Sequence, residues 1–268
     1  MTAVLDAPVS TITTTRRAVS PVPLGRIVAV ELRKMFDTRA GFWLMASIGL
    51  ANLLATVSVI AFAPDATQTY DNYAAAIGFP MAVILPMVAV LAVTGEFSQR
   101  TGLTTFTLVP HRGRVLVAKA VASLGVAVVS MLLAFGVGAL GNLVGTAIAG
   151  VDTVWDISLA HAGYIVLGNV VGMTLGFTLG LVMRNTPGAI VGYFVISLVL
   201  PTIFGLLAAF QEWFSDLQPW VDLNYAQGAL FEGTMGGAEW AHLGVTSLIW
   251  LVVPLAVGVR LVLRSEIK

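Results

Sequence analysis

Six long apolar segments divide the sequence, and they constrain its fold more than any other feature. They cover residues 41–63, 74–94, 115–138, 159–183, 187–210 and 242–263. An α-helix of about 20 residues, rising about 1.5 Å per residue, crosses a hydrocarbon layer of about 30 Å. Because backbone polar groups in lipid must be paired within the segment, we expect six transmembrane helices and an all-α fold. The third apolar run continues to Ala149. This helix is therefore either long or leaves the membrane at its glycine-rich end.

Composition supports a polytopic membrane protein. Of the 268 residues, 57% are hydrophobic and 10% are charged, whereas soluble domains carry about 25% charged residues. The chain has no cysteine, which excludes disulfides and thiolate metal sites. Residues 1–22 are rich in Ser, Thr and Pro and lack the apolar region of a secretory signal. We expect them to form a disordered cytoplasmic tail, followed by one membrane domain at 23–268.

The basic residues predict the orientation of the helices. All fourteen Lys and Arg residues lie within 16–39, 100–119 and 260–268 or at Arg184. The connections 64–73, 150–158 and 211–241 contain none, and they hold nine of the fourteen acidic residues. The positive-inside rule therefore places both termini in the cytoplasm of a multi-pass protein of the cell membrane. Lys119 and Arg184 lie near span ends, where long side chains are expected to snorkel to the interface.

Several classes of activity are disfavoured by what the sequence lacks. None of the six spans contains an Asp or Glu, which argues against a proton- or sodium-coupled carrier. HExxH, GxSxG and any cluster of His with carboxylates are absent, as is a GxxxxGK[ST] phosphate loop. We therefore expect no enzymatic activity, metal site or cofactor in this chain. Energy for uphill transport would have to come from another chain.

The basic connection between the second and third spans, Gly95–Lys119, has two interpretations. In the first, its positive charges fix the orientation of the spans in the membrane and contact anionic lipid. In the second, Thr101 caps a short helix that Pro110 ends, and this helix docks on a cytoplasmic partner. The segment is also rich in Thr and Val, so an extended form of 101–110 competes with the helix.

A family resemblance bears on this choice. The order Glu96, Gly102, Leu108, Pro110, Arg112/Arg114 and Lys119 resembles the first cytoplasmic loop of ABC-2-type permeases, the six-span membrane subunits of ABC exporters. This chain has Leu103 where the family often has Thr or Ser. The resemblance implies that the loop contains a coupling helix that contacts an ATPase subunit. The implied contact residues are Glu96, Arg100, Thr101, Gly102, Leu103 and Phe106, flanked by Arg112 and Arg114.

Residues 23–40 predict an amphipathic helix at the inner membrane interface. Leu24, Ile27, Leu32 and Met35 are among its apolar face. The resemblance also implies such a helix, and "ELRK", which includes Glu31, Arg33 and Lys34, is similar to the family's wording. Glu31 points into the apolar face. It either pairs locally with Lys34 or forms a salt bridge with a basic residue of the 95–119 stretch.

The spans themselves carry packing and bending signals. Small residues repeat every fourth position in the fourth span, and they predict a smooth ridge for intrasubunit packing or, alternatively, a dimer contact. This ridge consists of Gly168, Gly172, Gly176 and Gly180. Prolines inside spans two, five and six can bend them, and the resemblance implies that spans two and five line a translocation route. The candidate lining residues are Phe79, Pro86, Met87, Tyr193, Pro201 and Phe204, which suit a lipophilic cargo. The 211–241 connection is either a set of short helices capping the outer exit or a solvated acidic face.

The resemblance implies a permease subunit that hydrolyses nothing itself. It would associate with two ABC ATPase subunits carrying ATP and Mg, and with a second permease, identical or homologous, in the lipid membrane. We expect no nucleic-acid partner. The alternative is a stand-alone pore or scaffold of the same topology, without an ATPase.

Overall fold

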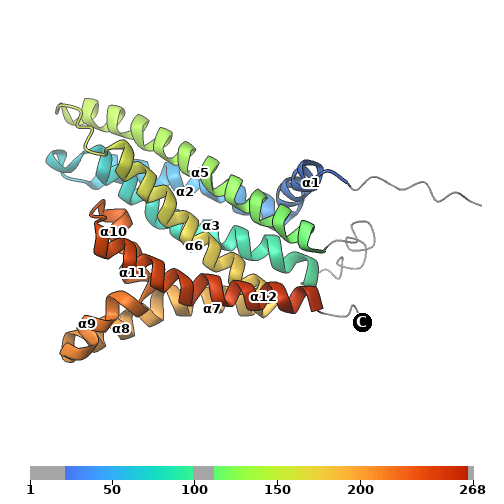
Figure 1. The fold of residues 1–268 in the computed structure, drawn as a ribbon. Coiled ribbons are helices and arrows are strands. Elements are labelled where there is room, and N and C mark those ends of the chain that lie inside the picture. The colour runs from blue at the N-terminus through green and yellow to red at the C-terminus, as the bar shows by residue number, and fades with distance from the viewer. Residues whose placement is uncertain (1–21, 99–111, 265–268) are drawn as a thin grey trace, which may run out of the picture.

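The chain folds into an all-helical bundle (Figure 1). The computed structural model describes residues 22–98 and 112–264, and regular structure in these two ranges is helical, without strands. Six helical stretches are long and apolar enough to cross a membrane, as the apolar segments predict. These stretches are Arg39–Phe62, Tyr70–Phe97, Gly113–Ala149, Leu159–Met183, Thr186–Phe210 and Gly237–Arg264. The protein is therefore a multi-pass membrane protein in its architecture.

Two helices at the N-terminal side meet at a capped break. Helix α1 (Leu24–Asp37) is followed directly by α2 (Arg39–Phe62). The hydroxyl of Thr38 accepts a hydrogen bond from the Gly41 amide at 3.0 Å, which satisfies one of the free donors at the start of α2. The buried residues of α1 are Ile27, Glu31 and Met35, spaced four apart, so one stripe of this helix faces the bundle.

Three helices form the centre of the bundle: α3 (Tyr70–Ser98), α5 (Arg112–Ala149) and α6 (Leu159–Met183). Of the two alternatives for the third apolar run, the single long helix is observed, since α5 continues unbroken for 38 residues. At 1.5 Å per residue this is about 57 Å. Helix α6 has the most buried span and packs along α3.

The fifth and sixth spans are each interrupted by a short π-helix, called a break here, and the two breaks lie in the same short sequence pattern. The fifth consists of α7 (Thr186–Phe194), the π-helix η2 (Val195–Val199) and α8 (Leu200–Phe210). The sixth consists of α11 (Gly237–Ser247), the π-helix η3 (Leu248–Val252) and α12 (Val253–Arg264). Both breaks carry the pattern I-x-L-V-x-P-x-x-x-G, at 196–205 and 249–258. In each, the proline follows the π-helix by two residues.

Proline determines which backbone hydrogen bond is missing at the η2 break. In η2 the Leu200 amide bonds the Val195 carbonyl, five residues back. The next donor in that ladder would be position 201, which is proline and has no N–H. The carbonyl of Ile196 is therefore left without its helical donor. It accepts instead from the side-chain amide of Asn224, with Nδ2 and O 3.1 Å apart.

Short helices fill the connection between the fifth and sixth spans, as one of its two interpretations expects, and its acidic residues Glu212, Asp216 and Glu232 are exposed, as the other expects. They are α9 (Glu212–Val221) and α10 (Leu223–Glu232), and α11 begins five residues later. Side chains tie this region to the spans through carbonyl groups: Gln227 donates to Gly168 O at 2.7 Å, and the Trp250 indole donates to Val221 O at 2.8 Å. The first bond holds α10 against the fourth span, and the second joins the end of α9 to the sixth span.

The bundle has two ends that differ in their elements (Figure 1). At one end, called the α1 end here, lie α1, the last turns of α3, the first turns of α5 and the last turns of α12. The other, called the α10 end, carries α10 and the two loops that join α2 to α3 and α5 to α6. The ranges 1–21 and 265–268, and with them most of the predicted N-terminal tail, lie outside the described residues.

Candidate functional site

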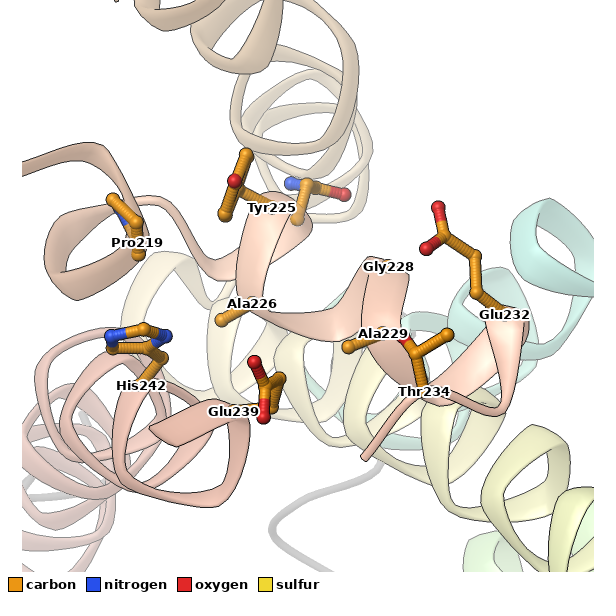
Figure 2. Close-up of a pocket in the computed structure, with 10 residues that line it drawn as sticks. Pro219, Tyr225, Ala226, Gly228, Ala229, Glu232, Thr234, Glu239 and His242 are labelled. Carbon is orange, nitrogen blue, oxygen red and sulfur yellow. The ribbon is translucent and has the colours of Figure 1, made fainter. Parts of the chain in front are cut away.

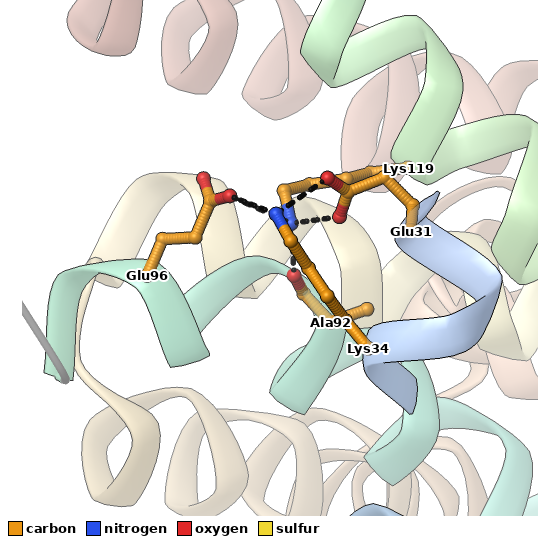
Figure 3. Close-up of polar contacts among 5 residues, drawn as sticks. All are labelled: Glu31, Lys34, Ala92, Glu96 and Lys119. Carbon is orange, nitrogen blue, oxygen red and sulfur yellow. Dashed lines mark hydrogen bonds and ion pairs between the residues drawn. The ribbon is translucent and has the colours of Figure 1, made fainter. Parts of the chain in front are cut away.

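Four charged residues from three helices meet at the α1 end (Figure 3). Helix α1 supplies Glu31 and Lys34, which lie three residues apart and therefore on one face. Glu96 comes from the last turn of α3, and Lys119 from the beginning of α5. We call these four residues the ion-pair cluster. It joins α1 to both helices that border residues 99–111.

The shortest contact of the cluster links α1 to α5. Lys119 Nζ lies 2.6 Å from Glu31 Oε2 and 3.3 Å from Glu96 Oε1. It also donates to the carbonyl of Ala92 at 2.9 Å. Lys119 thus donates hydrogen bonds to Glu31 and to Ala92 O, and Glu96 adds a second carboxylate at ion-pair distance.

Lys34 makes the second bridge between the two carboxylates. Its Nζ lies 2.8 Å from Glu31 Oε1 and 3.2 Å from Glu96 Oε1. Each carboxylate therefore has two ammonium partners, and each ammonium has two carboxylates. The four formal charges sum to zero, which is the condition under which buried ions are tolerated.

Burial differs within the cluster. The side chains of Glu31 and Lys119 are 4% and 3% exposed, while that of Lys34 is 42% exposed. Burial acts to lower the pKa of Lys34, but its hydrogen bonds and charge interactions with Glu31 and Glu96 outweigh this, so its pKa is raised above the ordinary 10.5. Lys34 is thus held in its charged form at neutral pH.

A further contact fixes the start of α1 on α5. Arg114 Nη2 donates to the Val22 carbonyl, two residues before α1, at 2.8 Å. Met35 and Leu116 belong to one buried apolar cluster that also contains Val93 of α3. Polar and apolar contacts therefore act together to hold α1, α3 and α5 as one unit at this end.

The sequence-derived expectations for this region have different outcomes. The predicted salt bridge between Glu31 and a basic residue of the 95–119 stretch is present, and so is the alternative local pair with Lys34. The expectation that Lys119 snorkels to the interface is wrong, because its side chain is buried and its ammonium group pairs with Glu31 and Glu96 inside the bundle. Arg184, the other residue expected to snorkel, is exposed at the end of α6.

Most of the predicted ATPase contacts cannot be placed. Residues Arg100, Thr101, Gly102, Leu103 and Phe106 lie outside the described residues, as does the choice between a helix and an extended form for 101–110. Arg112 begins α5, but its side chain is likewise not described. Glu96 and Arg114 are described, and both contact this chain's own N-terminal region.

The predicted translocation residues do not form one group. Pro86 of α3 and Tyr193 of α7 are both buried, and the Tyr193 hydroxyl donates to Ala82 O at 2.6 Å. Pro86 removes the donor that this carbonyl would have in a regular helix, so the tyrosine replaces it. Phe79, by contrast, is 77% exposed on the surface of the bundle.

The remaining three of these residues lie between those extremes. Met87 is half-buried and packs on the apolar cluster that contains Tyr193. Pro201 is half-buried in the first turn of α8. Phe204 contacts Phe214 of α9, with ring centroids 5.5 Å apart.

The glycine ridge of α6 lies within the chain's own bundle. A Cβ on Gly176 would lie 2.5 Å from the Pro86 carbonyl oxygen, and one on Gly180 would lie 3.0 Å from Val93 Cβ. Gly168 faces the ring of Phe231. Gly172 has more space, since its nearest neighbours would be 3.8 Å away.

Comparison of the chain with protein-family models and with curated proteins returned no match. The resemblance to ABC-2-type permeases accordingly rests on the loop motif, the span count and the charge distribution. The function is argued below from the geometry of the ion-pair cluster.

Proposed function

We propose that this chain is the membrane-spanning permease subunit of an ATP-binding cassette exporter of the ABC-2 type. The observation that carries the proposal is the pairing of Lys119 with Glu31 and Glu96. It links α1 to the two helices that border residues 99–111. A partner that pressed on this connection would move three helices together.

The distribution of charge supports the orientation that the proposal requires. Every described Lys and Arg side chain belongs to α1, to the first residue of α2, to the start of α5, to the end of α6 or to α12. By the positive-inside rule, the α1 end faces the cytoplasm. Arg26, Arg33 and Phe36 of α1 are exposed, which suits a helix lying at the inner interface with anionic lipid.

In the proposed cycle, the chain itself binds no nucleotide. Two ATPase subunits carry ATP and Mg, and their closure presses on the 95–119 stretch. The ion-pair cluster passes this displacement to α1, α3 and α5, and the spans change from inward-open to outward-open. A second permease, identical or homologous, completes the assembly, and the apolar spans suit a lipophilic cargo.

The direct test is to purify the tagged full-length chain from membranes of its native host and to identify bound proteins. We expect a protein with a GxxxxGK[ST] phosphate loop, and ATP hydrolysis by the complex but not by the chain alone. Glu31→Gln should lower transport per ATP hydrolysed. Asp37→Asn is the control, because Asp37 is exposed and its ion pair with Arg33 is a long surface contact of 3.9 Å.

Two results would contradict the proposal. One is a chain that purifies without any ATPase and still transports or conducts, which would favour the pore alternative. The other is labelling of residues near Arg114 from outside intact cells.

A further inference from the structure

A cavity of about 420 Å³ lies at the α10 end, between α9, α10 and α11 (Figure 2). This volume falls in the range of cavities that hold small molecules. Ala226 and Ala229 of α10 form part of its wall, and their small side chains leave the space open. Figure 2 shows Glu239 and His242 of α11 facing α10 across it.

Within the described part of the chain, the cavity is lined by acidic side chains and by no Lys or Arg. Glu232 and Glu239 both line it, and no Lys or Arg lies anywhere in the sequence between Arg184 and Arg260. The segment that builds the cavity therefore brings carboxylates without a compensating cation. Such a site attracts positive charge and repels anions.

Aromatic groups accompany the carboxylates. Tyr225 lines the cavity and is 55% exposed. His242 also lines it and contacts the Trp220 ring edge-on, with centroids 4.4 Å apart. Aromatic faces next to carboxylates are the combination that stabilises organic ammonium groups, through cation–π contact as well as charge.

A metal ion is a poorer match than an organic cation. No group of three or more His, Cys, Asp or Glu side chains placed to hold a metal occurs within residues 22–98 and 112–264. The volume also exceeds what a single ion needs, because a cavity that holds one water molecule takes only about 10–15 Å³.

We propose that this cavity binds a small organic cation, of the protonated-amine or quaternary-ammonium class. Glu232 and Glu239 provide the negative charge, and Tyr225 provides an aromatic face. Asn224 lines the same cavity, and its side-chain amide donates to the Ile196 carbonyl at the η2 break. A bound cation would therefore contact a residue that is hydrogen-bonded to the fifth span. The proposal does not depend on the permease function, because binding requires neither ATP nor a partner.

The test uses the purified full-length chain and two probes of equal shape. Choline carries a quaternary ammonium, and 3,3-dimethylbutan-1-ol replaces the nitrogen by carbon and is neutral. Isothermal titration calorimetry measures binding of each. We expect saturable binding of choline and at least tenfold weaker binding of the neutral probe.

Neutralising the carboxylates identifies the site. Glu232→Gln and Glu239→Gln should each weaken choline binding about threefold to fivefold, the scale of partly exposed ion pairs. Glutamine at 239 keeps an oxygen for the Gly236 amide, which Glu239 accepts at 2.9 Å to cap α11. Glu212→Gln, on α9 but outside the lining, should leave the affinity unchanged.

Three outcomes would overturn the proposal: no saturable binding of choline, equal binding of the neutral probe, or unchanged affinity in both Glu232→Gln and Glu239→Gln. Because Glu232 is exposed and lies at the end of α10, its variant keeps the fold even if Glu239→Gln disturbs α11. A lost ATPase partner would leave all three measurements unaffected.

Discussion

Replacing Lys119 by methionine tests how strongly the ion-pair cluster holds the α1 end together. Methionine matches the length of the lysine stem and removes only the charge and its donors. The variant leaves Glu31, whose side chain is 4% exposed, with Lys34 as its remaining partner in the cluster. It also removes the donor to Ala92 O.

The magnitude follows from burial and from the remaining partner. Removing one member of a buried ion pair typically costs about 3–5 kcal/mol, because the other charge stays buried. Lys34 still lies 2.8 Å from Glu31, so we expect the lower end of that range, about 3 kcal/mol. Lys119→Met combined with Glu31→Gln removes both charges of the closest pair. The double variant should lose about 1–3 kcal/mol less stability than the two single variants lose when their losses are added.

Thermal unfolding in detergent, followed by tryptophan fluorescence at one fixed scan rate, provides the assay. A fixed rate matters because such unfolding is often irreversible and its midpoint then depends on the rate. Chains of about 150–250 residues shift by about 2–4 °C per kcal/mol, so Lys119→Met should lower the midpoint by about 6–12 °C. The control is Arg33→Gln, which breaks a pair whose side chains are 81% and 69% exposed and should change little.

Two results would refute this reasoning. If Lys119→Met unfolds at the same temperature as Arg33→Gln, the buried pair contributes nothing to the hold on α1. If the double variant loses as much stability as the two single variants added together, then Glu31 and Lys119 act independently.

Three further predictions concern other parts of the chain. Gly145→Ala should destabilise the protein by more than about 2 kcal/mol in the same unfolding assay, because the Tyr73 hydroxyl occupies the space of the new methyl group; a milder effect would show that the tyrosine moves aside easily. Asn224→Leu should cost about 1–3 kcal/mol by leaving the Ile196 carbonyl unpaired, whereas a neutral result would mean that water replaces the amide. The pKa of Lys34 is raised in the folded protein, so its contribution to stability is complete below pH 10.5 and is lost as pH rises through the folded value. The difference in midpoint between wild type and Lys34→Gln should therefore narrow above pH 10.5, and a constant difference would contradict the charge-based explanation.

The helical architecture was accessible from the sequence because a span needs a minimum apolar length. The fourth predicted span, 159–183, coincides with α6. The mismatch of Glu31 with the apolar face of α1 also predicted a salt bridge, since a carboxylate in that position needs a partner. Lys119 was misjudged because nearness to a span end says nothing about which helices surround the residue.

The π-helical breaks could not be read in the same way. A π-helix shifts the helical register by a single position, and a continuous apolar segment such as 187–210 has no polar face to reveal that shift. The role of Asn224 depends on a carbonyl that is unpaired only after the break has formed. Proline at 201 marked a bend, but only the structure connects that bend to α10.

The two π-helices have a consequence for how the molecule deforms. Together η2 and η3 bracket the continuous stretch Leu200–Ser247, which comprises α8, α9, α10 and α11. The chain thus enters and leaves this stretch through a π-helix, and each π-helix is followed by a proline that has no backbone N–H to donate. Tilting this stretch against the rest of the bundle would break side-chain bonds such as those of Gln227 and Trp250. It would also pull Leu223, Leu230 and Leu243 out of the buried apolar cluster that they share with α6.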